Sequence, residues 1–336
     1  MTSVYGEGAV LESGAIRGPI DEPVREAPPA GPRAELVERV KDALAALPTH
    51  FTTRTYIEGL EAGDLFSLNS MLGGSIEIQV VESLNKLRAV WDPDEEWAEY
   101  EFRRSAQTFP DVRLVTESPS RVSAGQECVL GVELKGWYLL SREGMPSFRY
   151  TPNRLACDVH DLLVVVPWRL DNVLAGAPIV YAPSVESARY AADMRTYYWT
   201  TMRREKDEAA GKRRGDDYYD VIPSQEAHPY PDPKTKISDK ALRDSGGNFG
   251  RSARSKGLMD DYIAGMLESP VAGIQARHWV GFFQAYAEGA QEGELHDRIV
   301  KKLADYRRMQ GMESEELTEL LALWASKLPR RGQNED

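Results

Sequence analysis

Two charged side chains of the central region have types and a spacing that could do chemistry. In "CVLGVELKGWYLL", residues 128 to 140, Glu133 and Lys135 stand inside an otherwise apolar run. Side chains alternate between the two faces of a strand, so this pair would share one face, about 7 Å apart along the chain. A buried charge without a partner is costly, so such a pair requires mutual neutralisation, a metal ion or exposure. We therefore expect a third partner.

Asp111 is the natural third partner. It precedes the short apolar stretch "VRLV", which can pair with the run at 128–140 as a hairpin across the turn segment "ESPSRVSAG". Such a hairpin would bring Asp111 beside Glu133, where two carboxylates repel each other unless a divalent cation lies between them. Mg²⁺ prefers carboxylate and water oxygens, and a nearby ammonium group can orient or deprotonate a water, or offset charge on a pentavalent phosphate. This chemistry is suited to phosphodiester cleavage. The alternative is a cross-strand ion pair on a solvated sheet face, worth about 0–1 kcal/mol.

Helices and strands around these residues would have to position them. The stretch "AELVERVKDALAAL" (34–47) has apolar residues at helical spacing, and a second helical region covers 64–91. Gly73 and Gly74 in that region indicate a break or a tight packing contact. Residues 109–181 have the pattern of strands, with "DLLVVVPW" (161–168) typical of a strand buried on both faces. These features predict an α/β fold with a mixed β-sheet flanked by helices.

The remaining segments suggest four divisions of the chain. Residues 1–33 are rich in Pro, Gly and Glu and predict a mostly disordered or extended arm. Residues 34–215 are expected to form the core, and near its end the stretch "SVESARYAADMRTYYWTTMRREKDEAA" predicts a helix. Residues 216–256 carry four prolines and many charges and predict a loop-rich insertion. The segment 257–333 predicts a helical C-terminal region of four helices, which would pack on the core or form a dimer contact.

Composition excludes several classes of protein. The 336 residues are 42% apolar and 28% charged, without an apolar run long enough to cross a membrane. The first residues lack the features of a secretory signal, and Cys128 and Cys157 lie in apolar contexts typical of reduced thiols, so a cytoplasmic protein is expected. The net charge of −12 argues against a general nucleic-acid coat. Basic residues nevertheless gather at 195–215 and 234–256, either as solvated surface segments or as local binding sites.

The residues Pro110-Asp111, a spacer and Glu133-Leu134-Lys135 resemble the PD-(D/E)XK signature of the restriction-endonuclease-like nucleases. Of the three Pro-Asp dipeptides in the chain, this one alone is followed at a suitable distance by an acid-x-Lys in a convincing strand. The resemblance covers roughly residues 64–181. It implies a restriction-endonuclease-like core, with Asp111, Glu133 and Lys135 as catalytic residues and Mg²⁺ as the cofactor.

The same family commonly adds an acidic residue from the helix before the Pro-Asp strand. Here "LGGSIEIQVVESLNKL" offers Glu77 and Glu82, which lie about 140° apart around a helix, so at most one is expected at the metal. We favour Glu77 as a catalytic residue and metal ligand, and the alternative is that both are ordinary surface acids. His160, beside Asp158 and Asp161, is a weaker candidate for a catalytic base, because a lone His at a strand end is usually structural.

A stand-alone chain of this size looks most like a type II restriction enzyme, a Mg²⁺-dependent and sequence-specific endonuclease of double-stranded DNA that usually acts as a homodimer. The segment "DSGGNFGRSARSK" (244–256) supplies candidate DNA-binding residues, although a flexible basic loop is an equal alternative. These candidates are Asn248, Arg251, Arg254 and Lys256.

Three alternatives remain open at this point. The first is a repair or structure-selective nuclease with the same active site. The second is a non-catalytic DNA-binding or defence-associated protein that keeps the fold only. The third is a helical interaction protein whose last roughly 110 residues bind a partner.

Overall fold

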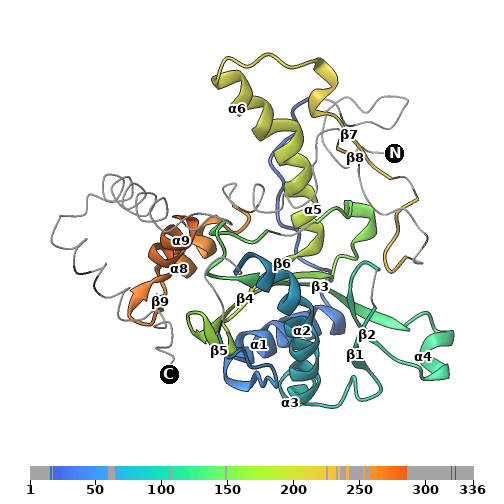
Figure 1. Cartoon of the computed structure of the whole chain (residues 1–336). Helices are drawn as coiled ribbons and strands as arrows, with labels where there is room; N and C mark the ends of the chain where they lie inside the picture. The colour runs from blue at the N-terminus through green and yellow to red at the C-terminus, as the bar shows by residue number, and fades with distance from the viewer. Residues whose placement is uncertain are drawn as a thin grey trace, which may run out of the picture.

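A mixed β-sheet with helices around it forms the centre of the molecule (Figure 1). The computed structural model describes residues 16, 18–59, 65–105, 108–147, 150–224, 226–231, 234, 240–241, 253, 257–285, 319 and 322. Within this part of the chain, no helix is long and apolar enough to cross a membrane.

Three helices precede the sheet in the chain: α1 (Pro32–His50), α2 (Leu65–Lys86) and the short α3 (Arg88–Trp91). Both long helices confirm the predicted helical regions. The apolar stripe of α1 is buried, because its members recur on one face at helical spacing. Gly73 does not break α2, which is continuous through it. A side chain built on Gly136 would lie 3.6 Å from the Cα of Gly73, so the glycines mark a close contact between α2 and the sheet.

The sheet follows the path β1-β2-β3-β4-β5, and β6 pairs with β4 beside this path. The hairpin predicted from the sequence is present, since β2 is antiparallel to β3, with Val112 opposite Val132. β3 runs parallel to β4, while β1 is antiparallel to β2, and both β5 and β6 are antiparallel to β4. The strands are β1 (Glu101–Arg104), β2 (Val112–Val115), β3 (Cys128–Tyr138), β4 (Leu162–Asn172), β5 (Ala175–Val180) and β6 (Ser184–Ser187).

The two central strands, β3 and β4, are longer than their neighbours in the sheet. β3 and β4 each have 11 residues, whereas β2 has four and therefore ends where β3 continues. The apolar residues of β4 from Leu162 to Trp168 are all buried, as expected for a strand covered on both faces. The short helix α4 (Pro119–Ser123) lies in the connection between β2 and β3. The result is an α/β fold with a mixed sheet, consistent with a restriction-endonuclease-like core.

The helix expected to start at residue 184 starts later, and this part of the prediction is wrong. Ser184–Ser187 form β6 because they pair with β4, and the helix α5 (Ala188–Tyr197) begins only after them. Ser187 caps α5, since its hydroxyl accepts a hydrogen bond from the backbone N–H of Tyr190 at 3.3 Å. A π-helical turn (Tyr198–Met202) joins α5 to α6 (Arg203–Ala209).

The segments on either side of the core are partly described. In the arm before α1, Ile16 pairs with Val221, and the backbone N–H of Ile20 donates to the Thr201 hydroxyl at 2.9 Å. In the C-terminal region two of the four expected helices are present, while the stretches 294–310 and 315–328 lie outside the described residues apart from positions 319 and 322. The elements described after α6 are β7 (Val221–Ile222), β8 (Lys240–Ala241), α8 (Asp260–Glu268), β9 (Pro270–Val271), β10 (Ile274–Gln275) and α9 (Ala276–Ala285).

Candidate active site

Asp111 and Glu133 meet where β2 begins and β3 continues past it. Because Val112 pairs with Val132, the preceding Asp111 stands opposite Glu133. Asp111 Oδ1 accepts a hydrogen bond from the backbone N–H of Leu134 at 2.9 Å, and its own N–H donates to Glu133 Oε2 at 3.3 Å. The hairpin thus fixes both carboxylates through the backbone of the neighbouring strand.

Lys135 bridges the two carboxylates. Its Nζ lies 2.9 Å from Asp111 Oδ2 and 2.8 Å from Glu133 Oε1. The three side chains are only 10–20% exposed, so water screens the ion pairs poorly. The structure therefore brings together all three residues that the sequence singled out.

Burial and nearby charges both shift the pKa values of Glu133 and Lys135. Burial raises the pKa of Glu133 above its usual range, and the Asp111 carboxylate raises it further, while Lys135 acts against both. Burial alone would lower the pKa of Lys135, but Glu133 and Asp111 outweigh it, so the net shift of this pKa is upward. Lys135 is therefore a stable ammonium group in this state.

Glu77 approaches the cluster from α2, whereas Glu82 is exposed to solvent. Burial raises the pKa of Glu77, and the nearby Asp111 carboxylate adds to the shift, while Lys135 and the backbone of Gly136 oppose it. Glu77 Oε2 lies 3.8 Å from an Nη2 atom of Arg104, a residue that the sequence did not single out. Of the two candidate helix acids, Glu77 is the one beside the other site residues.

Glu77→Gln is expected to lower a Mg²⁺-dependent cleavage rate by roughly 10- to 100-fold, because an amide is a weaker ligand than a carboxylate and carries no charge. A higher Mg²⁺ concentration should restore part of the rate. Glu82→Gln, on the same helix and exposed, is the matched control and should cleave as the unsubstituted protein does. Equal cleavage rates for the two variants would show that Glu77 is not part of the active site.

The residues of the cluster fit a hard divalent cation. Asp111 and Glu133 present carboxylate oxygens in one place, and burial and the Asp111 carboxylate both raise the pKa of Glu133, an effect that a bound cation would oppose. In the part of the chain that the structure describes, no group of three or more His, Cys, Asp or Glu side chains forms a metal cage. Mg²⁺ does not require one, because it is usually held by one or two carboxylates together with water and substrate oxygens.

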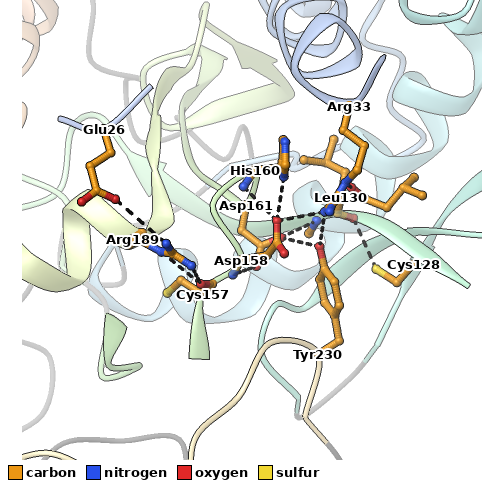
Figure 2. A network of polar contacts seen from close by, with 12 residues as sticks. Glu26, Arg33, Cys128, Leu130, Cys157, Asp158, His160, Asp161, Arg189 and Tyr230 are labelled. Atoms are coloured by element: carbon orange, nitrogen blue, oxygen red, sulfur yellow. Dashed lines mark hydrogen bonds and ion pairs between the residues drawn. The ribbon is translucent and has the colours of Figure 1, made fainter. Parts of the chain in front are cut away.

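A second polar network surrounds Asp161, and the sequence analysis did not predict it (Figure 2). The carboxylate of the fully buried Asp161 accepts hydrogen bonds from the backbone N–H of Gly131 at 2.8 Å, the Tyr230 hydroxyl at 2.9 Å and the backbone N–H of Asp158 at 2.8 Å. Burial is the main cause that raises the pKa of Asp161 to about 7. This network ties residue 230 of the insertion to β3, two residues before Glu133.

His160 belongs to this network rather than to the Asp111 cluster. It is buried, and its Nδ1 lies 2.8 Å from Asp158 Oδ1, which also accepts a hydrogen bond from Arg33 at 2.9 Å. These contacts support the structural interpretation of His160.

The four candidate DNA-binding residues, Asn248, Arg251, Arg254 and Lys256, lie outside the described residues. Comparisons with protein-family models, with curated proteins and with solved structures found no match.

Proposed function

We propose that this protein is a Mg²⁺-dependent endonuclease of double-stranded DNA, similar to the PD-(D/E)XK nucleases and most similar to type II restriction enzymes. The observation that carries the proposal is the contact of Lys135 Nζ with both Asp111 Oδ2, at 2.9 Å, and Glu133 Oε1, at 2.8 Å. Asp111, directly before β2, and Glu133 and Lys135, both in β3, supply the acid, acid and amine of the signature that this chain resembles. The mixed sheet is consistent with the same family.

In this proposal Asp111 and Glu133 would hold the cation, with Glu77 as an auxiliary ligand. When bound, Mg²⁺ would polarise the phosphate and lower the pKa of a bound water. Water attacks phosphorus, the bond from phosphorus to the leaving oxygen breaks, and the proton of the water passes to solvent or to the leaving oxygen. Lys135, whose ammonium group contacts both carboxylates, would orient that water and offset charge on the pentavalent phosphate.

The test is incubation of the purified protein with supercoiled plasmid. Discrete fragments are expected in Mg²⁺, with no cleavage in EDTA, because the two carboxylates would then lack the cation that the chemistry needs. The measurement is gel electrophoresis over time. Random nicking would favour a repair or structure-selective nuclease instead, and an intact plasmid in both Mg²⁺ and Mn²⁺ would overturn the nuclease proposal.

The partners and the location belong to the same proposal. A homodimer would match a twofold-symmetric DNA site, and the insertion at 216–256 would read the bases. Cytoplasmic location agrees with the two free cysteines, Cys128 and Cys157. Burial raises the pKa of both thiols, so neither is poised to form a disulfide.

A further inference from the structure

Arg104 borders the candidate active site from the outermost strand of the sheet. It is the last residue of β1, which lies at the end of the strand path, and it pairs with Val112, the residue after Asp111. Beyond it, the backbone N–H of Ser105 donates to the carbonyl oxygen of Asp111 at 2.8 Å. These contacts hold the backbone of Arg104 close to Asp111.

The side chain of Arg104 is more exposed than that of Lys135, the other cation of the site, and its contact with a carboxylate is longer. Lys135 is 18% exposed and contacts two carboxylates at hydrogen-bond distance. Arg104 is 37% exposed, and among the described residues its one ion pair is the long contact of 3.8 Å to Glu77. Its guanidinium can therefore accept a further anion without losing a close partner.

We propose that Arg104 binds a phosphate group of the DNA at the cleavage site, an inference that rests on the proposed nuclease function. A phosphodiester that enters this site would meet the carboxylates of Glu77, Asp111 and Glu133. These four anionic groups exceed the positive charge of Lys135 and a bound Mg²⁺ together, so a further cation is needed. A guanidinium carries donors in a fixed fork that matches two phosphate oxygens, which makes arginine the suited side chain. Because β1 is at the end of the sheet path, Arg104 can meet a duplex that approaches this side of the molecule.

The preceding residue provides a matched control. Arg103 is on the same strand and is 44% exposed, but it forms short contacts with both Glu101 and Glu117. Its charge is thus already neutralised by two exposed carboxylates. Alanine at position 103 removes the same side chain from the same strand without removing the charge beside Glu77.

Two measurements on the full-length protein test the proposal. The first is the affinity for a fluorescently labelled random-sequence duplex in EDTA over a series of KCl concentrations. Arg104→Ala should reduce the slope of log affinity against log salt by about one, the effect of one lost phosphate contact, and Arg103→Ala should leave the slope unchanged. The second is plasmid cleavage in Mg²⁺, where Arg104→Ala should lower kcat/KM by about 100-fold and Arg104→Lys by less.

The outcomes separate this inference from the proposed function. If the unsubstituted protein cleaves plasmid and Arg104→Ala matches Arg103→Ala in both measurements, Arg104 is not a phosphate contact and the nuclease proposal stands. If the unsubstituted protein binds DNA without cleaving it, and Arg104→Ala still lowers the salt slope, the phosphate contact stands and the nuclease proposal fails. Absence of any DNA binding would overturn both.

Discussion

Replacement of Lys135 by alanine is expected to reduce plasmid cleavage by about a thousandfold or more, measured as the first-order loss of supercoiled plasmid at saturating protein. Among the described residues, Lys135 is the one side chain that forms ion pairs with both Asp111 and Glu133. In the proposed mechanism, its loss removes the positive charge that would face the reacting phosphate. A preorganised donor at such a position contributes about a hundredfold to a thousandfold by itself, and here the geometry of the two carboxylates depends on it as well.

The same substitution is expected to destabilise the fold, because the buried Glu133 and the half-buried Asp111 are left without their shared partner. Breaking a buried ion pair costs about 3–5 kcal/mol. Circular dichroism and the midpoint of thermal unfolding must therefore accompany the cleavage rates. The double variant Glu133→Gln/Lys135→Met replaces both charges by neutral side chains of similar size and should fold while it remains inactive. Cleavage by folded Lys135→Ala within tenfold of the unsubstituted rate would exclude the assigned role.

Among glycine-to-alanine substitutions near the site, Gly131→Ala is expected to lower the free energy of unfolding the most. A β-carbon at this position would lie 2.2 Å from Cγ of Pro110 and 2.6 Å from Oδ1 of Asp161, closer than real contacts allow. Either the Pro110 ring moves, and Asp111 with it, or Asp161 leaves the hydrogen bonds from Gly131 and Tyr230. We expect a loss of about 3 kcal/mol in the free energy of unfolding, measured by urea denaturation.

The rate of plasmid cleavage by Gly131→Ala should also fall, by about 100-fold. A displacement of about 1 Å at a catalytic group is enough for such a loss. Gly74→Ala is the control. Gly74 lies within α2, and a β-carbon there has no atom within 4 Å, so alanine should stabilise the protein by up to about 1 kcal/mol. A Gly131→Ala protein as stable as the unsubstituted one would show that the space between Pro110 and Asp161 adapts freely.

Local sequence pattern was sufficient to predict the hairpin that carries the candidate active site. Alternation along β3 places Glu133 and Lys135 on one face, because the strand period is two and depends on nothing outside the strand. The short connection after "VRLV" makes the antiparallel pairing with β2 the nearest available one, so Asp111 could be placed opposite Glu133. The buried stripe of α1 is equally local, since helical spacing of its apolar residues marks the face that packs.

Contacts between segments distant in the sequence decided which other residues surround this hairpin. The choice of Glu77 over Glu82 depends on how α2 lies on the sheet, which no spacing within α2 reveals. The strand β6 looks helical in isolation, and only its pairing with β4 makes it a strand, because tertiary hydrogen bonds outweigh a weak local preference. The bond from Tyr230 to Asp161 spans 69 positions, and the contact of Arg104 with Glu77 joins β1 to α2. The sequence alone determined which groups could do chemistry on one hairpin, whereas the packed core determined which others surround them, because burial and charge act through space rather than along the chain.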